Sequence, residues 1–287
     1  MSQPEPLLSI CIITFNHENY IRQAIDSVLM QNVNFPYQII IADDNSTDST
    51  REILKEYEDK YKQTIKLILQ PQNKGAVKNW LDLIEYPKSK YIAYLEGDDY
   101  WTDPDKLQLQ VDFLENNADY SCHYFNCIYS NTQLPFYEDN ETFHFNSSIA
   151  GGKFGPTLSI VFRRSIFSKI NLTKYFEGNI IGDWPLELLA LMSGKGYRDK
   201  RICGVYRVTD NGAISTIKNK YSNPKVMSRY IFFKNYVYKK SYRELGYKKI
   251  SLTLFFKFSL KNYKYNENYK LRHLFLDFGL IGSRFIF

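Results

Sequence analysis

The sequence has 287 residues, of which 44% are hydrophobic and 24% are charged, and its formal net charge is +6. This composition excludes a disordered or collagen-like chain, and four cysteines are too few for a disulfide-stapled one. Because the cysteines lie in apolar runs without CxxC spacing, we expect reduced thiols buried in the core of a cytoplasmic protein. The sequence shows no basic leader and no long apolar run, so we expect no standard export signal and no membrane span.

The first 130 residues alternate short apolar runs with segments of helical periodicity, which predicts an α/β fold with a parallel sheet covered by helices. The predicted strands are 8–13, 37–42, 65–69 and 91–95, and the predicted helices are 21–29, 49–62, 76–86 and one beginning at Asp103-Pro104. Ser49 and Glu52 have the spacing of a capping box. Further along, the pattern predicts a loop at 131–156, a helix at 184–193 and a strand at 202–208.

Polar side chains follow three of these strands at the point where each strand ends. They are Thr14-Phe15-Asn16 after the first strand, Asp43-Asp44 after the second and Asp98-Asp99 after the fourth. Parallel strands bring their carboxyl ends to one edge of the sheet, so four carboxylates should crowd together there. Such a group requires a cation or several hydrogen-bond donors, and Mg²⁺ or Mn²⁺ suits oxygen ligands. Neither GxGxxG nor GxxxxGK[ST] follows the first strand, which disfavours a dehydrogenase or a P-loop ATPase.

These motifs together resemble the family-2 glycosyltransferases with the GT-A fold. The resemblance rests on Ile13-Thr14-Phe15-Asn16, on residues 43–48, on Asn73-Lys74-Gly75 and on residues 95–101. It covers residues 7–130 well and 157–210 loosely. It implies a Rossmann-like mixed sheet with flanking helices, and a catalytic domain over 1–216 with a donor-binding half at 7–130 and an acceptor half at 131–216.

The resemblance also implies roles for individual residues. Asp99 would bind the metal that bridges the donor diphosphate, and Asp98 would face the metal, the ribose or the sugar. Asp183 in Gly182-Asp183-Trp184 would be the general base, although its position also suits a helix N-cap. Trp101 and Trp184 could fill the core or stack on a sugar, and their positions beside these two motifs favour contact with the acceptor. The remaining donor-site residues implied are Thr14, Phe15, Asn16, Asp43, Asp44, Asn73, Gly75 and Lys78. Many relatives carry a histidine near the diphosphate where this chain has Thr209.

The predicted function is therefore a metal-dependent, inverting transfer of a sugar from a nucleotide donor, with a UDP-sugar favoured. The acceptor would be a growing surface polysaccharide or a lipid-linked glycan. Two alternatives stay open on sequence grounds: a non-catalytic nucleotide- or glycan-binding module on the same scaffold, and a Mg²⁺-dependent nucleotidyltransferase. In sequence, the binding module would differ from the enzyme only in not needing Asp183.

The last segment, 217–287, carries 16 basic and 3 acidic side chains, a balance of 16 − 3 = +13, and is rich in Tyr and Phe. This composition predicts a helical extension that contacts an anionic membrane, which would place the protein at the inner face of the cell membrane. Nucleic-acid binding fits the same composition, but we favour the membrane. The other interpretations are a helical bundle that packs on the catalytic domain and an interface between copies of the chain.

Overall fold

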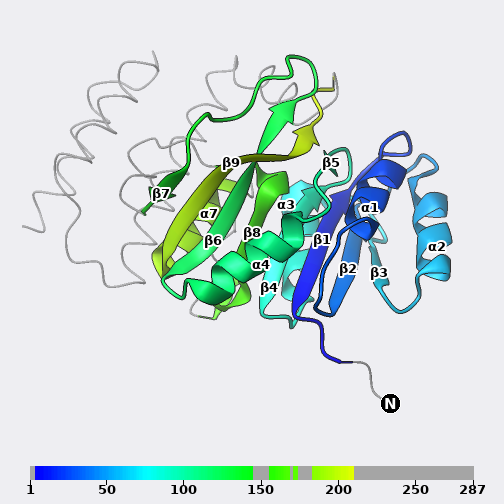
Figure 1. Ribbon diagram of the computed structural model, residues 1–287. Helices are drawn as coiled ribbons and strands as arrows, with labels where there is room; N and C mark the ends of the chain where they lie inside the picture. The colour runs from blue at the N-terminus through cyan, green and yellow to red at the C-terminus, as the bar shows by residue number, and fades with distance from the viewer. Residues whose placement is uncertain (1–3, 145–154, 169–170, 174–182, 210–287) are drawn as a thin grey trace, which may run out of the picture. The chain divides into compact units, whose positions relative to one another are not determined.

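The computed structural model describes residues 4–144, 155–168, 171–173 and 183–209. All of these except Thr209 belong to one compact unit, which comprises 1–144 and 154–208. Its sheet begins with four parallel strands in the order β3-β2-β1-β4: Ile65–Leu69, Tyr37–Asp43, Leu8–Thr14 and Tyr91–Glu96. Figure 1 shows these strands side by side, with β1 between β2 and β4.

The second half of the sheet is mixed. Strand β8 (Ile160–Arg163) lies between β4 and β6 (Tyr120–Tyr129) and is antiparallel to both. The long strand β9 (Lys195–Tyr206) runs parallel to β6 and pairs antiparallel with the short strands β5 (Tyr100–Trp101) and β7 (Glu141–Phe143). Two 3₁₀ turns, η1 (Thr157–Ser159) and η2 (Arg164–Phe167), flank β8.

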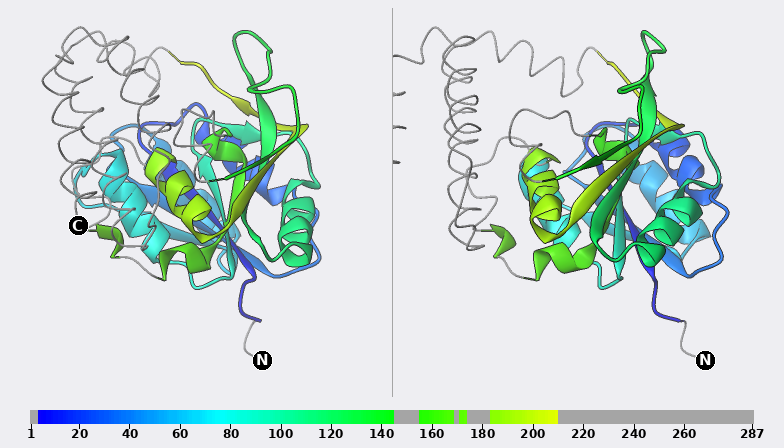
Figure 2. Two further views of the ribbon diagram at one scale, coloured as in Figure 1. Left: turned by 90° about the vertical axis from the view of Figure 1, so that its left-hand side faces the viewer. Right: turned by 60° about the vertical axis from the view of Figure 1, so that its left-hand side comes forward.

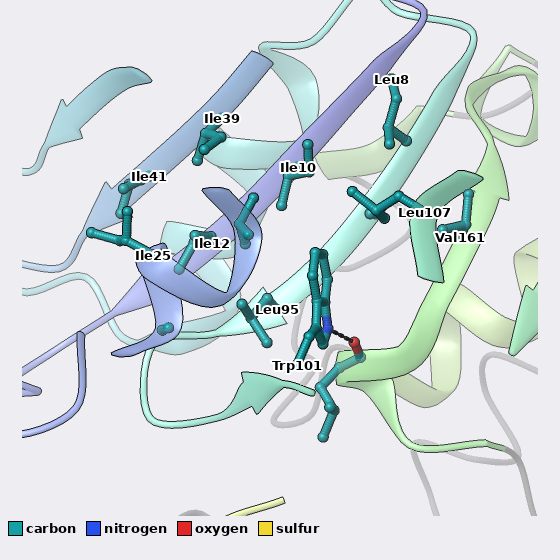
Figure 3. Packing of buried hydrophobic residues seen from close by; sticks show 14 of the residues in the cluster. Leu8, Ile10, Ile12, Ile25, Ile39, Ile41, Leu95, Trp101, Leu107 and Val161 are labelled. Atoms are coloured by element: carbon teal, nitrogen blue, oxygen red, sulfur yellow. Dashed lines mark hydrogen bonds between the residues drawn. The ribbon is translucent and has the colours of Figure 1, made fainter. Parts of the chain in front are cut away.

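Helices cover both faces of the sheet (Figure 2). Helices α1 (Ile21–Leu29), α2 (Thr50–Lys60) and α4 (Lys106–Asn116) lie on one face, and α3 (Ala76–Glu85) and α7 (Asp183–Ser193) on the other. The central strands are apolar on both sides because both sides are buried. Ile10, Ile12 and Ile41 face α1 and its neighbours in the core cluster that Figure 3 shows.

The predicted strands and helices of the first 130 residues are confirmed, with differences at two helix starts. Ser49 makes no side-chain cap hydrogen bond, so the predicted capping box does not form; instead the Thr50 N–H donates to Oδ1 of Asp48 (3.0 Å). Helix α4 begins at Lys106 rather than at Asp103, whose Oδ1 accepts from the Asp105 N–H (3.0 Å). In both cases an aspartate two residues ahead of the donor takes the hydrogen bond, which is the geometry of an Asx turn.

The predictions for the cysteines and for the rest of the chain are confirmed in part. All four cysteines are free and buried, as expected. Strand β8 was not predicted, and β9 begins at Lys195, seven residues before the predicted start at 202. The part of the predicted loop 131–156 that is described includes β7. The predicted boundary at 216 and the extension 217–287 lie outside the described residues. None of the helices in the described part combines the length and hydropathy of a membrane-spanning segment.

Lys106 is fully buried, although it carries an ammonium group. Its Nζ donates to Oε1 of Gln110 (2.7 Å) and lies 4.1 Å from the centre of the Trp101 ring. Burial lowers the pKa of Lys106 from 10.5 to about 8. The cation–π contact and the hydrogen bond to Gln110 therefore only partly replace the lost hydration.

This shift predicts a pH dependence of stability. Between pH 8 and 10.5 the unfolded chain holds the Lys106 proton and the folded chain does not, so the free energy of unfolding should rise with pH. The shift is worth about 3 kcal/mol across that window. Urea unfolding of the wild type and of Lys106→Met should show this gain only in the wild type. Exposed Lys66→Met is the control and should keep it. Parallel pH profiles for wild type and Lys106→Met would contradict the prediction.

Candidate functional site

The acidic pairs predicted from the sequence lie at one edge of the sheet, on either side of β1. Thr14, the last residue of β1, pairs with Asp43 of β2, and the Asp44 N–H donates to the Thr14 carbonyl (3.0 Å). On the other side, the Gly97 N–H donates to the Ile13 carbonyl (2.8 Å) just before Asp98-Asp99. The carboxyl ends of β1, β2 and β4 thus form a single site, as the parallel order requires.

The loops after β1 and β2 are tied together. The Asn16 N–H donates to Oγ of Ser46 (2.9 Å), and Oδ1 of Asn16 accepts from the Thr47 N–H (2.8 Å). Asn16 and Asn45 both have positive φ, +55° and +62°, a conformation that asparagine tolerates better than most residues. Phe15 stays 42% exposed at this edge. Its ring is available to stack on a planar ligand such as a nucleobase.

Asp43 is an internal support of the site. It is fully buried and accepts from Nε of Arg51 (2.5 Å), from the Ser46 N–H (3.1 Å) and from Oγ of Ser46. Arg51 also donates to the carbonyl of Gln70, which joins β3 to the same cluster. The carboxylate is therefore paired within the protein. Asp43 therefore holds the loop after β2 in place.

Asp44 organises the segment before α3. Its Oδ1 accepts from the Lys74 N–H (2.7 Å), its Oδ2 from the Gly75 N–H (2.8 Å), and its carbonyl from Nδ2 of Asn73 (3.1 Å). Gly75 has a φ of +84°, which explains glycine at this turn. A carboxylate has about four acceptor positions, so two remain after these bonds. Lys78 is exposed on the first turn of α3.

Asp99 is a buried acidic group of the site. It is 1% exposed, its Oδ1 accepts from the Arg207 N–H (2.7 Å), and its Oδ2 is buried without a hydrogen-bond partner among the described residues. Burial, followed by the nearby charges of Glu96 and Asp98, raises the pKa of Asp99 well above its usual value. Within the described residues, no three His, Cys, Asp or Glu side chains gather as a metal site.

Sequence reasoning missed two residues at this site. Arg207 directly follows β9, and its guanidinium donates to the carbonyl of Asp98 and to Oε1 of Gln23. His17 lies with its Nε2 4.0 Å from Oδ2 of Asp98, and burial lowers its pKa, so the ring is neutral at pH 7. The signal that could have found them is their position near a strand end. His17 comes directly after Asn16 in the loop that follows β1, and Arg207 comes directly after Tyr206, the last residue of β9.

Gly97 leaves no room for a side chain. A Cβ at this position would lie 2.9 Å from Nδ1 of His17 and 2.9 Å from both Oγ1 and Cβ of Thr14. Overpacking of this kind costs about 1–3 kcal/mol. We expect Gly97→Ala to lower the free energy of unfolding by that amount, measured by urea denaturation. The double variant Gly97→Ala/His17→Ala should recover part of the loss. Wild-type stability of Gly97→Ala would show that the contacts relax without cost.

The predicted acceptor contact at Trp101 is corrected by the structure. Trp101 is 1% exposed, belongs to the core cluster and donates from Nε1 to the carbonyl of Leu158 (2.6 Å), as Figure 3 shows. A ring enclosed in this way has no face for a sugar, and its role is packing. Asp183 and Trp184 lie in the first turn of α7, but their side chains are outside the described residues, as is Gly182.

The fold is that of the GT-A class of nucleotide-sugar transferases. The structure resembles that of *Staphylococcus aureus* TarS in complex with UDP-GlcNAc, with a TM-score of 0.66 and 16% identity over 93% of this chain and 77% of that one. It also resembles the mannosyltransferase PcManGT of *Pyrobaculum calidifontis* in complex with GDP-Man and Mn²⁺, with a TM-score of 0.55 and 13% identity over 98% and 79% of the two chains.

A comparison with protein-family models identifies the family of this chain. The family model described as Glycosyl transferase family 2 matches residues 9–175, and the chain belongs to this family. It is 36% identical to the putative teichuronic acid biosynthesis glycosyltransferase TuaG of *Bacillus subtilis* over 40% of this chain and 44% of TuaG. It is 28% identical to the *Escherichia coli* glucosyltransferase WfgD, which uses UDP-Glc and a GlcNAc-diphosphoundecaprenol acceptor, over 56% and 62%. Against *Mycobacterium tuberculosis* Rv1520 the identity is 44%, over 39% of this chain and about a third of Rv1520.

Proposed function

We propose that this protein transfers a sugar, with inversion, from a nucleoside-diphosphate donor to a glycan or lipid-linked acceptor in the synthesis of a surface polysaccharide. The observation that carries the proposal is the pair Asp98-Asp99 beyond β4, at the edge where β1 and β2 also end, in a family-2 chain. The named relatives TuaG and WfgD support polysaccharide or lipid-linked acceptors, and the UDP-sugars of WfgD and TarS favour a UDP-sugar donor.

The described residues fit a divalent cation. Oδ2 of Asp99 is buried and has no hydrogen-bond partner among the residues that the structure describes, and Asp98 adjoins it with a partly exposed carboxylate. Mg²⁺ and Mn²⁺ accept such a set, because in nucleotide sites they are held by one or two carboxylates together with phosphates and water. When bound, the cation would neutralise the charge that develops on the leaving diphosphate. Asp98 and Asp99 are the residues that would hold it.

The other residues of the site would bind the donor. Phe15 would stack on the base. The Asp44 carboxylate, which accepts from the N–H groups of Lys74 and Gly75, has acceptor positions left for an N–H of the base. Asn73, Gly75 and Lys78 would close the donor pocket from the α3 side. Asp183, in the first turn of α7, would take the proton of the attacking acceptor hydroxyl. Because no covalent intermediate is needed, the anomeric configuration would invert.

The test is a screen of UDP-, GDP- and dTDP-sugars with and without Mn²⁺. We expect at least one donor to raise the melting temperature of the protein in a Mn²⁺-dependent way, and slow release of its nucleoside diphosphate even without acceptor. Stabilisation with no turnover in the presence of lipid-linked acceptors would favour a binding module. No stabilisation by any donor would contradict the proposed function. Sedimentation of the full chain with anionic liposomes at low salt tests the proposed membrane contact of 217–287 separately.

A further inference from the structure

Arg207 makes an unusual set of contacts at the edge of the site. Its backbone N–H donates to Oδ1 of Asp99 (2.7 Å), while its guanidinium donates to the carbonyl of Asp98 and to Oε1 of Gln23. The guanidinium carbon also lies 5.0 Å from the centre of the Tyr20 ring and 4.5 Å from that of Tyr100.

These contacts join parts of the chain that are distant in sequence. Tyr20 and Gln23 lie at the start of α1, Asp98 and Tyr100 follow β4, and Arg207 follows β9. The planar guanidinium lies against two aromatic rings and donates to two acceptors, which an ammonium group does not reproduce. The side chain therefore fixes the position of the Arg207 backbone relative to the Asp98-Asp99 turn.

The backbone contact has a consequence for Asp99. One carboxylate oxygen is held by the Arg207 N–H and the other, Oδ2, is buried and unpartnered within the described residues. A carboxylate fixed through one oxygen has a defined orientation for the other. Partners of this kind, one step removed from the metal, commonly change metal affinity by about 10- to 100-fold when they are lost.

We propose that Arg207 is a positioning residue for the metal site: its side chain anchors the end of β9, and its backbone N–H orients Asp99 toward the cation. This inference rests on the proposed function, because it assumes that Asp98 and Asp99 hold the metal. It assigns Arg207 a role that acts through Asp99.

The charge of Arg207 and its anchoring role should have opposite effects on the affinity for the cation, which makes the proposal testable. Arg207 places a positive charge beside the acidic pair, so its removal alone should strengthen cation binding. Loss of the anchor should weaken it. Arg207→Lys keeps the charge and loses the planar fork, so positioning predicts weaker binding in this variant, whereas a pure charge effect predicts no change.

The experiment measures the Kd for Mn²⁺ by electron paramagnetic resonance on the full chain, with Mn²⁺ alone and with UDP or GDP added. We expect Arg207→Lys to raise this Kd by about 10-fold or more. Arg207→Ala should raise it too, although the lost charge offsets part of the effect. Arg201→Ala is the matched control. Arg201 lies in β9, the strand that Arg207 follows, and its Nε contacts Oδ2 of Asp103 (2.5 Å), so the Kd of this variant for Mn²⁺ should stay within about twofold of the wild-type value.

The outcomes separate the two proposals. If wild-type protein binds Mn²⁺ in no condition, the metal site itself is wrong and this inference falls with it. If the wild type binds Mn²⁺ and the Kd of Arg207→Lys is unchanged, the proposed function stands and the positioning role is overturned. An equal weakening in Arg201→Ala overturns it as well, because the effect would then be a general one of β9. Should Arg207→Ala fail to fold, Arg207→Lys decides alone.

Discussion

Asp99→Asn should lower kcat/KM for sugar transfer by about 10²- to 10⁴-fold. The substitution keeps the size of the side chain but removes the negative charge that would hold the cation. A metal that neutralises a leaving group contributes several kcal/mol, and each 1.36 kcal/mol is a factor of about ten in rate. The measurement is the Mn²⁺-dependent rate with the donor found in the nucleotide-sugar screen.

Stability separates this effect from misfolding. Because Asp99 is buried beside Glu96 and Asp98, and its Oδ2 has no partner in the described part of the chain, loss of its charge removes a repulsion. The metal-free Asp99→Asn protein should therefore melt no lower than the wild type. Asp105→Asn, on the exposed start of α4, is the control and should keep full activity. An Asp99→Asn enzyme with near wild-type kcat/KM would exclude Asp99 as the metal ligand.

Asp183→Asn should reduce kcat by about 10²- to 10⁴-fold while leaving the affinity for the nucleotide nearly unchanged. Asparagine cannot accept the proton of the acceptor hydroxyl, so the chemical step fails although the donor still binds. Single-turnover transfer and nucleotide binding, measured on the same preparation, give the two quantities separately.

This substitution also distinguishes a base from a helix cap. Asparagine caps helices about as well as aspartate does, so a purely structural Asp183 would give a protein of normal stability and normal rate. Asp112→Asn, on the exposed side of α4, controls for the loss of one negative charge. A wild-type kcat in Asp183→Asn would move the role of base to another residue.

The parallel half of the fold was predictable because its signals are local. Each strand from β1 to β4 is a short apolar run, and each is followed by a polar turn or a helix of clear periodicity. The meeting of Thr14, Asp43 and Asp98-Asp99 at one edge then follows from the parallel order alone. The mixed half was not predictable in this way. Strand β8 has four residues, and its place between β4 and β6 depends on pairing with strands distant in sequence.

The misjudged site residues have a common cause. The sequence shows which residue types stand at a strand end, but not which oxygens are already paired. Asp43 and Asp44 look alike in the sequence, yet the Asp43 carboxylate accepts from Arg51 and Ser46 while that of Asp44 accepts from two loop amides. Trp101 adjoins the acidic turn but points into the core. Arg207 contacts Asp99 from 108 residues away, and no local pattern encodes that distance.

The insertion of β8 between β4 and β6 has a consequence for synthesis on the ribosome. Strand β4 ends at Glu96, but its partner β8 ends only at Arg163, 163 − 96 = 67 residues later. At about 5–20 residues per second, one side of β4 stays unpaired for roughly 3–13 s in the nascent chain. Unpaired strand edges recruit other chains. Translation pauses before β8 has left the ribosome should therefore promote aggregation, and pauses after that should not.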